Sequence, residues 1–202
     1  LKSKGYNMEI IRIGNQEWSI KNLDVDSFRN GEIIPECKTV EEWESAGEDG
    51  NPAWCYYENN KTNGEKYGKL YNWYAVKDLK GLAPTGWHIP SDDEWAHLIE
   101  NLGGKDTAGP KMKQKEGWNN DGNGNNESGF SGLPSGYRGF QHPTYYDCNF
   151  GDVGKLGGWW SSTEKDRDNA WGRDLFYRDA SIGRFLSADP NIDGTYDTQG
   201  YN

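Results

Sequence analysis

One short stretch of this 202-residue chain carries the signature of an amphipathic helix from start to end. Ser91 can accept a hydrogen bond from a backbone N–H of the first turn, while Glu94, three residues on, can reach back to the Ser91 amide. Gly103 and Gly104 follow, and glycine readily adopts the left-handed conformation that ends helices. Between these ends, apolar residues recur at i, i+3, i+4 and i+7, which predicts one buried face: Trp95, Leu98, Ile99 and Leu102.

Aromatic side chains must supply much of the core. Only 33% of residues are hydrophobic, and this share includes 10 Trp, 12 Tyr and 6 Phe, so a few wide rings fill the interior. The 27 glycines indicate tight turns and irregular backbone. Trp159 and Trp160 are adjacent, so on a strand they face opposite sides and we expect one of them to be buried. The length suits a single domain, residues 1–202, with long ordered loops.

Charge and hydropathy exclude several partners. The net charge is −10 and no run of Lys or Arg could neutralise several phosphates, so we expect no nucleic-acid partner. No run of about 18 apolar residues is present, so we expect no membrane span. Residues 1–6 lack the apolar centre of a signal peptide, which is consistent with a mature product. The three cysteines show neither CxxC spacing nor a nearby histidine pair, which disfavours zinc and thioredoxin-like chemistry.

The remaining pattern indicates an α+β fold with antiparallel strands. Met8 to Leu23 predicts a hairpin around the Gly14-Asn15 turn. Val40 to Ala46 can form one helical turn, and Lys66 to Asp78 has apolar spacings that favour a second helix, with a strand as the alternative. The last third predicts three short strands, at residues 158–162, 170–178 and 181–187.

Five blocks occur in order along the chain: PAWCYYENN (52–60), YGKLYNWYAV (67–76), GLAPTGWHIPSDDEW (81–95), NGNNESGFSGLPSGYR (123–138) and GGWWSSTE (157–164). Together they resemble the Fibrobacter succinogenes major paralogous domain, a family common on the surfaces of Bacteroidota. The resemblance implies a C-type-lectin-like fold with two short helices, antiparallel strands and long ordered loops, related to the formylglycine-generating-enzyme branch. His88 to Trp95 stands where that branch has R-L-P-T-E-x-E-W.

The chain departs from these patterns in two places. The enzyme branch needs a closely spaced cysteine pair near its C-terminal end, and none follows Cys148 here. The family normally closes with a strand similar to G-F-S-V-R-C, which the sequence does not contain, so we expect the closing strand to be missing. Because the family carries cysteines at the Cys55 position and in that strand, the resemblance implies a disulfide between the additional pair, Cys37 and Cys148, with Cys55 free or buried.

One loop alternates oxygen-bearing side chains, a spacing that can wrap a calcium ion. Asn126 and Gly132 stand where an EF-hand would need glycine and glutamate, so that helix-flanked loop is excluded. A glycine-asparagine turn solvated by water is the alternative, and the sequence leaves both open. The candidate metal ligands are Asp121, Asn123, Asn125 and Glu127.

Aromatic and arginine residues near the end of the chain suit recognition of sugars or peptides, because rings stack on sugar faces and guanidinium groups form directed hydrogen bonds. Burial of half of these rings in the core is the alternative. The candidate ligand-binding residues are Tyr145, Tyr146, Trp171, Arg173, Tyr177 and Arg178. Separately, Asp106-Thr107-Ala108 resembles an O-glycosylation tripeptide of Bacteroidota, which would modify Thr107.

No nucleophile elbow, phosphate loop or dinucleotide fingerprint occurs in the sequence. We therefore expect a non-catalytic binding or accessory module, exported to the cell surface or outer membrane, that recognises a glycan or a protein through its long loops. The alternative is a structural lipoprotein subunit of an outer-membrane assembly, lipid-anchored upstream of Leu1. An enzyme of the formylglycine-generating type is third.

Overall fold

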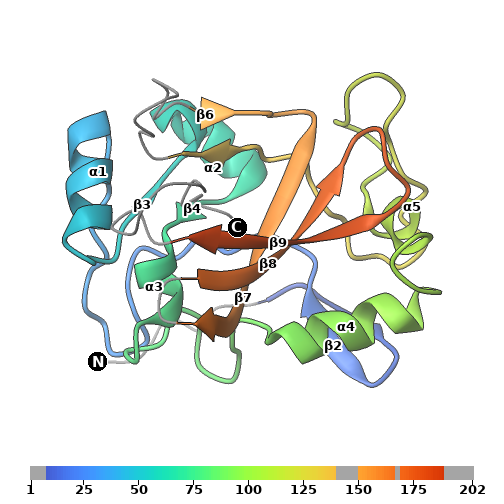
Figure 1. The fold of residues 1–202 in the computed structure, drawn as a ribbon, viewed down its shortest axis with the longest axis horizontal. Coiled ribbons are helices and arrows are strands. Elements are labelled where there is room, and N and C mark those ends of the chain that lie inside the picture. The colour runs from blue at the N-terminus through green and yellow to red at the C-terminus, as the bar shows by residue number, and fades with distance from the viewer. Residues whose placement is uncertain (1–7, 140–149, 167–168, 189–202) are drawn as a thin grey trace.

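The computed structural model describes residues 8–139, 150–166 and 169–188, and it is a mixed α and β structure with small antiparallel sheets. A three-stranded sheet, in the order β7-β8-β9, crosses the middle of the molecule, with α1 and α4 at opposite sides (Figure 1). Its strands are β7 (Leu156–Asp166), β8 (Asn169–Phe176) and β9 (Ile182–Ala188). All three strands fall where the sequence predicts them.

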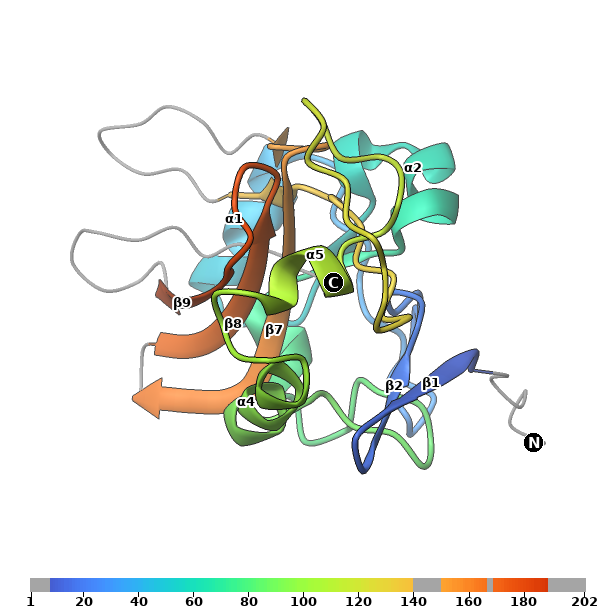
Figure 2. The ribbon, with the colours of Figure 1, turned by 90° about the vertical axis from the view of Figure 1, so that its right-hand side faces the viewer.

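Three two-stranded sheets surround this centre. They pair β1 (Ile10–Ile13) with β2 (Gln16–Ser19), β3 (Trp54–Cys55) with β4 (Leu70–Tyr71), and β5 (Tyr137–Arg138) with β6 (Phe150–Gly151). The β1–β2 hairpin is the one predicted around Gly14-Asn15, and it stands on the opposite side of the molecule from β9 (Figure 2).

The described residues hold five α-helices, so the prediction of two helices is wrong. They are α1 (Val40–Glu48), α2 (Lys61–Tyr67), α3 (Trp73–Lys77), α4 (Asp92–Asn101) and α5 (Ala108–Met112), with a short 3-10 helix at Tyr57–Asn59. Three of these have at most seven residues, too short to show an amphipathic stripe. None of the helices in the described part of the chain is long and apolar enough to cross a membrane.

Helix α4 confirms the prediction made from its ends and its apolar stripe. Oγ of Ser91 accepts from the Glu94 amide at 3.2 Å, and Oε2 of Glu94 accepts from the Ser91 amide at 2.8 Å. Trp95 and Leu98 are 2% and 0% exposed, while His97 is exposed. The buried face packs on the sheet and on the hairpin, whose Gln16 side chain donates to the Glu94 carbonyl oxygen at 3.1 Å.

The predicted helix over residues 66–78 is right only in part: Trp73–Lys77 form α3, but the chain changes conformation twice before it. Gly68 has a φ of +79°, a left-handed conformation that ends α2. The two residues of β4 are then extended and pair with β3. The side chain of Asn72 accepts from the Ala75 amide and starts α3. Residues 69–76 are all buried whichever element they belong to, so the apolar spacing there carries no helical period.

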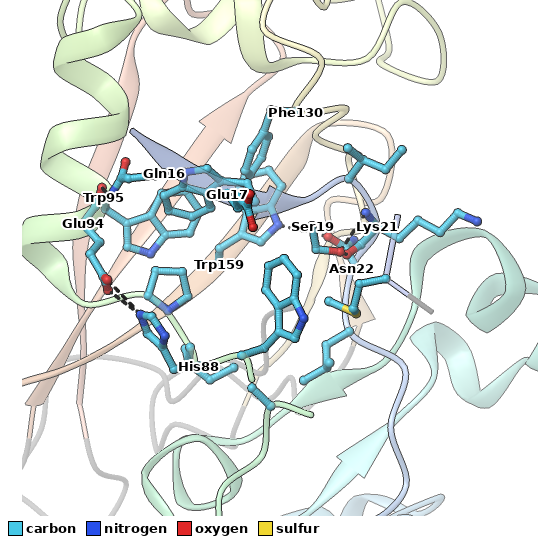
Figure 3. A pocket seen from close by; sticks show the side chains of 18 of the residues that line it. Gln16, Glu17, Ser19, Lys21, Asn22, His88, Glu94, Trp95, Phe130 and Trp159 are labelled. Carbon is cyan, nitrogen blue, oxygen red and sulfur yellow. Dashed lines mark hydrogen bonds and ion pairs between the residues drawn. The ribbon is translucent and has the colours of Figure 1, made fainter. Parts of the chain in front are cut away.

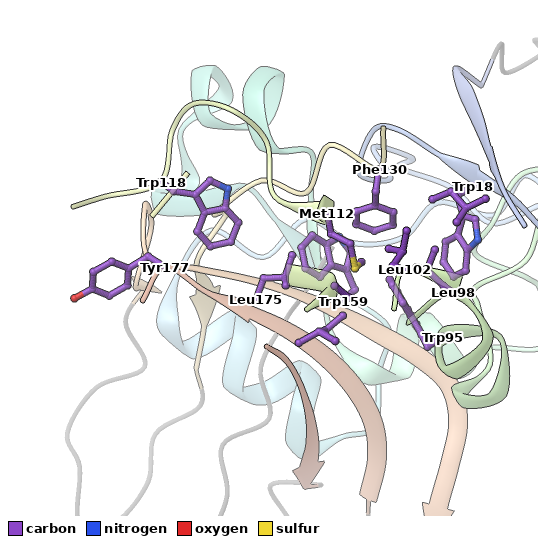
Figure 4. Packing of buried hydrophobic residues seen from close by; sticks show 13 residues of the cluster. Trp18, Trp95, Leu98, Leu102, Met112, Trp118, Phe130, Trp159, Leu175 and Tyr177 are labelled. Atoms are coloured by element: carbon purple, nitrogen blue, oxygen red, sulfur yellow. The ribbon is translucent and has the colours of Figure 1, made fainter. Parts of the chain in front are cut away.

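The central sheet is covered on both faces, so both adjacent tryptophans are buried rather than one. Trp159 is 6% exposed and belongs to a cluster with the α4 face, whereas Trp160, at 2%, faces a second cluster with Trp73. Figure 4 shows the first cluster running from Tyr177 at one end to Trp18 at the other. Strand β7 therefore forms part of two cores.

An ion-pair cluster joins the start of α4 to strands β8 and β9. The Asp92 carboxylate lies 2.6 Å from Nη1 of Arg173, which is 3% exposed, and 2.7 Å from Nη2 of Arg184. Partial burial alone would raise the pKa of Asp92, but hydrogen bonds from Arg184 and Arg173 outweigh it and hold the pKa below its usual value.

We expect Trp95→Ala to lower the free energy of unfolding by about 3–5 kcal/mol, because it removes a large ring from the centre of a packed core. Urea denaturation followed by circular dichroism measures this. His97→Ala, on the exposed side of the same helix, is the matched control and should change stability by no more than about 0.5 kcal/mol. A Trp95→Ala loss below about 1 kcal/mol would contradict the packing described above.

The Asp92 ion pairs should stabilise the fold in a pH-dependent way. Since the folded-state pKa is lowered, this contribution is fully present above the unfolded-state pKa of about 3.9 and is lost as pH falls through the folded-state value. The free energy of unfolding of Asp92→Asn should therefore be lower than that of the wild type at pH 7. In urea titrations below about pH 4, this difference in free energy should become smaller. Asp93→Asn, at the exposed neighbouring position, should show no such narrowing. If the loss of unfolding free energy in Asp92→Asn did not depend on pH, the ion pairs would be excluded as its cause.

Candidate functional site

A pocket of about 430 Å³ opens between the β1–β2 hairpin and the start of α4 (Figure 3). This volume lies in the range of about 300–1,000 Å³ typical of ligand sites. Its walls come from segments far apart in the sequence: residues 15–23, residues 83–90, the first turn of α4, residues 130–132 and strand β7. The fold, rather than any local motif, assembles the pocket.

Aromatic rings form the pocket floor, and hydrogen bonds fix them in place. Oδ1 of Asn22 accepts from Nε1 of Trp159 at 3.0 Å, and the Trp160 carbonyl oxygen accepts from Nε1 of Trp95 at 3.3 Å. Ring centroids in the floor lie 4.8–6.3 Å apart, the spacing of aromatic rings in contact. The rings cannot turn without breaking these contacts, so the floor is preorganised. Its four members are Trp18, Trp95, Phe130 and Trp159.

Trp87 is the accessible ring of the pocket. It is half-buried, whereas each floor ring is at most 7% exposed. A turn places it, because the Trp87 amide donates to the Pro84 carbonyl oxygen at 2.9 Å. The Arg29 guanidinium then donates to the carbonyl oxygens of Ala83 and Trp87, at 3.0 and 2.9 Å. This loop is therefore held from outside the pocket, which leaves the indole of Trp87 free to line it.

The charged groups at the rim are paired within the protein except Glu17, which has no ion-pair partner among the described residues. Nε2 of His88 lies 2.8 Å from the Glu94 carboxylate at one side of the pocket (Figure 3), and Lys21 is paired with Glu9 near the hairpin. Partial burial alone would raise the pKa of Glu94, but hydrogen bonds from Ser91 and His88 outweigh it and lower that pKa. Glu94 is thus ionised at neutral pH and already has partners.

Two buried polar atoms on the hairpin side lack a hydrogen-bond partner. They are Oε1 of Gln16, an acceptor, and Nε1 of Trp18, a donor, and both side chains line the pocket. A buried polar atom without a partner costs about 1–3 kcal/mol. Both atoms lie beneath the accessible surface on the hairpin side of the pocket.

The structure separates the ligand-binding residues expected from the sequence. Arg173 is buried and committed to Asp92, so it is not presented to a ligand. Trp171 is half-buried, and the Arg184 guanidinium lies 3.4 Å from its ring centroid, so one face of that ring is already covered.

Tyr177 is buried as well, at 6% exposed, in the cluster that contains Trp118. The reason is close packing, since a Cβ on Gly122 would lie 2.4 Å from the Tyr177 carbonyl oxygen. Arg178 is exposed, with its guanidinium over the Tyr177 ring at 4.9 Å. Two further expected residues, Tyr145 and Tyr146, lie outside the described residues.

The candidate calcium loop is exposed, but its amide oxygens already have partners. Oδ1 of Asn123 accepts from the Trp118 amide at 2.9 Å, and Oδ1 of Asn125 accepts from the Glu127 amide at 3.0 Å. With Asp121, these side chains belong to a loop that packs on α5, where a Cβ on Gly124 would meet the Pro110 carbonyl oxygen at 2.3 Å. These contacts favour the turn over the ion site, and calcium binding stays a prediction.

The remaining candidates lie away from the pocket. Cys37 and Cys55 are free and buried, and Cys148, the expected partner of Cys37, lies outside the described residues. Burial raises the pKa of the Cys55 thiol to about 12. Thr107 is exposed, and its hydroxyl donates to the Gly103 carbonyl oxygen at 2.9 Å.

The pocket residues were not identified as a site from the sequence. Trp87 falls only within a family block, and Trp18 falls only within the predicted hairpin. The sequence contains one local signal. Trp87 lies between Gly86 and Pro90, in a stretch without helical or strand periodicity, so the pattern does not assign its ring to a buried face. The residues of the β1–β2 hairpin that line the pocket show no comparable signal in the sequence.

Comparison with known proteins supplies a family. The model of the Fibrobacter succinogenes major domain matches residues 11–198 of the chain. No curated protein and no solved structure matches significantly. The family match covers the whole described fold, including the hairpin, α4 and the central sheet, and agrees with the five sequence blocks. The chain belongs to the Fibrobacter succinogenes major domain family.

Proposed function

We propose that this chain is a non-catalytic binding module that holds a glycan in the aromatic pocket between the β1–β2 hairpin and α4. The observation that carries the proposal is the pocket itself, an opening of about 430 Å³ with a fixed aromatic floor and the accessible ring of Trp87. A pyranose presents apolar C–H faces that pack on such rings, and hydroxyl groups that need polar partners at the edge.

The polar groups of the pocket favour a hydroxyl-rich ligand over an anionic one. His88 is paired with Glu94, so it is not free to neutralise a ligand anion, and the unpaired carboxylate of Glu17 would repel one. A hydroxyl both donates and accepts, so it suits the unpartnered acceptor of Gln16 and the unpartnered donor of Trp18. Side-chain amides and hydroxyls elsewhere on the wall can bind further hydroxyl groups, at Asn15, Ser19 and Ser131.

The fold family, the domain organisation and the location of the protein are part of the same proposal. A C-type-lectin-like fold, a single domain over residues 1–202 and location at the cell surface or outer membrane rest on the resemblance of the sequence blocks. The aromatic and polar loops then serve as the recognition surface, and the pocket replaces the Trp171 region as its centre, because burial removes Arg173 and Tyr177 from that surface.

A structural lipoprotein subunit of an outer-membrane assembly is the second candidate, in which the same opening would receive a protein segment. Single exposed apolar side chains such as Ile33 and Leu79, at 68% and 103%, are normal on protein surfaces, so this candidate rests on the resemblance of the sequence blocks. An enzyme of the formylglycine-generating type is third. Burial raises the pKa values of both Cys37 and Cys55, which leaves little thiolate for such chemistry at neutral pH.

We expect Trp87→Ala to weaken binding at least about tenfold, equivalent to about 1.4 kcal/mol, because it removes the accessible stacking surface. An array of bacterial and plant glycans, probed with the purified chain, selects the ligand, and titration calorimetry measures its affinity. Trp171→Ala is the matched control, a half-buried tryptophan outside the pocket, and should leave affinity within about twofold.

Four outcomes would decide against this proposal. Equal glycan affinity of Trp87→Ala and wild type would show that the glycan binds outside this pocket. Loss of affinity in Trp171→Ala alone would show that it binds at the central sheet. Absence of any glycan ligand, together with stoichiometric retention of an outer-membrane protein, would favour the assembly subunit. Loss of glycan binding on adding a chelator would show that the Asp121 to Glu127 loop acts through calcium.

A further inference from the structure

Two of the three cysteines lie side by side in the smallest core cluster. The Cys37 amide donates to the Trp54 carbonyl oxygen at 2.9 Å, and the Trp54 amide donates to the Pro35 carbonyl oxygen at 3.0 Å. These bonds define a parallel bridge between Glu36 and Trp54, so Cys37 and Cys55 are the next pair along it. Both thiols belong to one cluster of buried residues and are 5% and 0% exposed.

The bridge sets the separation of the two residues. Neighbouring strands lie about 4.7–4.9 Å apart, and the two side chains of a parallel pair point to the same face. Disulfides join residues whose Cα atoms are about 4.4–6.8 Å apart. From this register we infer that Cys37 and Cys55 form a disulfide when the chain folds in an oxidising compartment.

The cross-link exchanges one weak contact for a covalent bond. The Cys37 thiol now donates to the Glu42 carbonyl oxygen over 3.5 Å, and rotation about its Cα–Cβ bond would release it towards Cys55. The two thiols lose two protons and two electrons as the S–S bond forms. A small-molecule disulfide such as glutathione disulfide accepts the electrons, its own S–S bond breaks, and two glutathione thiols leave.

Burial determines when this reaction occurs. The Arg138 guanidinium beside both cysteines favours the thiolate form, but desolvation dominates and raises both pKa values. Thiolate is the attacking species, so the folded protein exchanges slowly. The bond therefore forms during folding and, once buried, resists reduction.

The bond would fasten the segment before α1 to β3. Arg138 already contributes to this junction by donating to the carbonyl oxygens of Cys37 and Thr39, at 2.7 and 2.6 Å. Its guanidinium also lies 4.9 Å from the centroids of Trp43 and Phe150. The cross-link would therefore hold α1, β3 and β5 together at a point far from the pocket, independently of ligand binding.

Peptide mapping tests the pairing directly, since each cysteine lies in its own tryptic peptide: 30–38, 39–61 and 139–155. The full chain is reduced, unfolded, refolded with a glutathione redox buffer, alkylated and digested without reductant. We expect peptides 30–38 and 39–61 to be linked, with Cys148 alkylated, and Cys148→Ser to keep the same link. A link that contains peptide 139–155, or alkylation of all three thiols, would overturn the inference.

Thermal unfolding supplies a second readout that does not depend on digestion. Wild type that is unfolded and refolded with a phosphine reductant should melt at a lower temperature than wild type refolded in the glutathione redox buffer, and Cys148→Ser should behave in the same way. Cys55→Ala should show no dependence on reductant. A wild-type melting temperature that does not change with reductant, or a dependence that survives in Cys55→Ala, would contradict a Cys37–Cys55 bond.

Discussion

The packing of Trp95 against its neighbouring rings is the interaction on which the rest of the structure depends. Its centroid lies 4.8 Å from that of Trp18 in the hairpin, 5.9 Å from Phe130 in a loop and 6.3 Å from Trp159 in the central sheet. One side chain of α4 thus contacts rings from three segments that lie far apart in the sequence. Because only 33% of the chain is hydrophobic, aromatic rings must supply the buried apolar surface that many smaller apolar residues supply in other cores.

The same packing explains why a pocket exists beside a well-filled core. Strand β7 places Trp159 and Trp160 in separate clusters on opposite faces, so the floor rings are fixed from below. The β1–β2 hairpin, which supplies Trp18 to the floor, is a two-stranded ribbon with little stability of its own. The pocket opens where this hairpin meets the start of α4, and the unpartnered atoms of Gln16 and Trp18 lie on its hairpin side.

The sequence predicted the elements whose signals are local. The capping box and apolar stripe of α4, the Gly14-Asn15 turn and the strands of the last third were all readable, because each depends on neighbours within about ten residues. Over residues 66–78 the sequence predicts one helix where the structure has a strand and a short helix, because the continuous burial of residues 69–76 removes the period that separates helix from strand. The left-handed Gly68 was the visible break within this stretch.

The candidate site could not be predicted, since it depends on which distant segments meet. Trp87 and Trp18 are separated by most of the first half of the chain, yet both line the pocket. Residue type alone also failed for Arg173 and Tyr177, whose chemistry suits recognition but whose burial serves the fold. Exposure, which distinguishes a binding ring from a core ring, is a property of tertiary packing.

The proposed glycan site is tested most directly by following the indole N–H groups of the ten tryptophans in a ¹H–¹⁵N spectrum during titration with a bound glycan. Ligand in the pocket should shift the Trp87 and Trp18 signals, because one ring lines the opening and the other gains a hydrogen-bond partner. The Trp43 signal, from the separate cluster around Cys55, should stay in place. Saturable binding that shifts Trp171 and leaves Trp87 and Trp18 unchanged would contradict the assignment of this pocket.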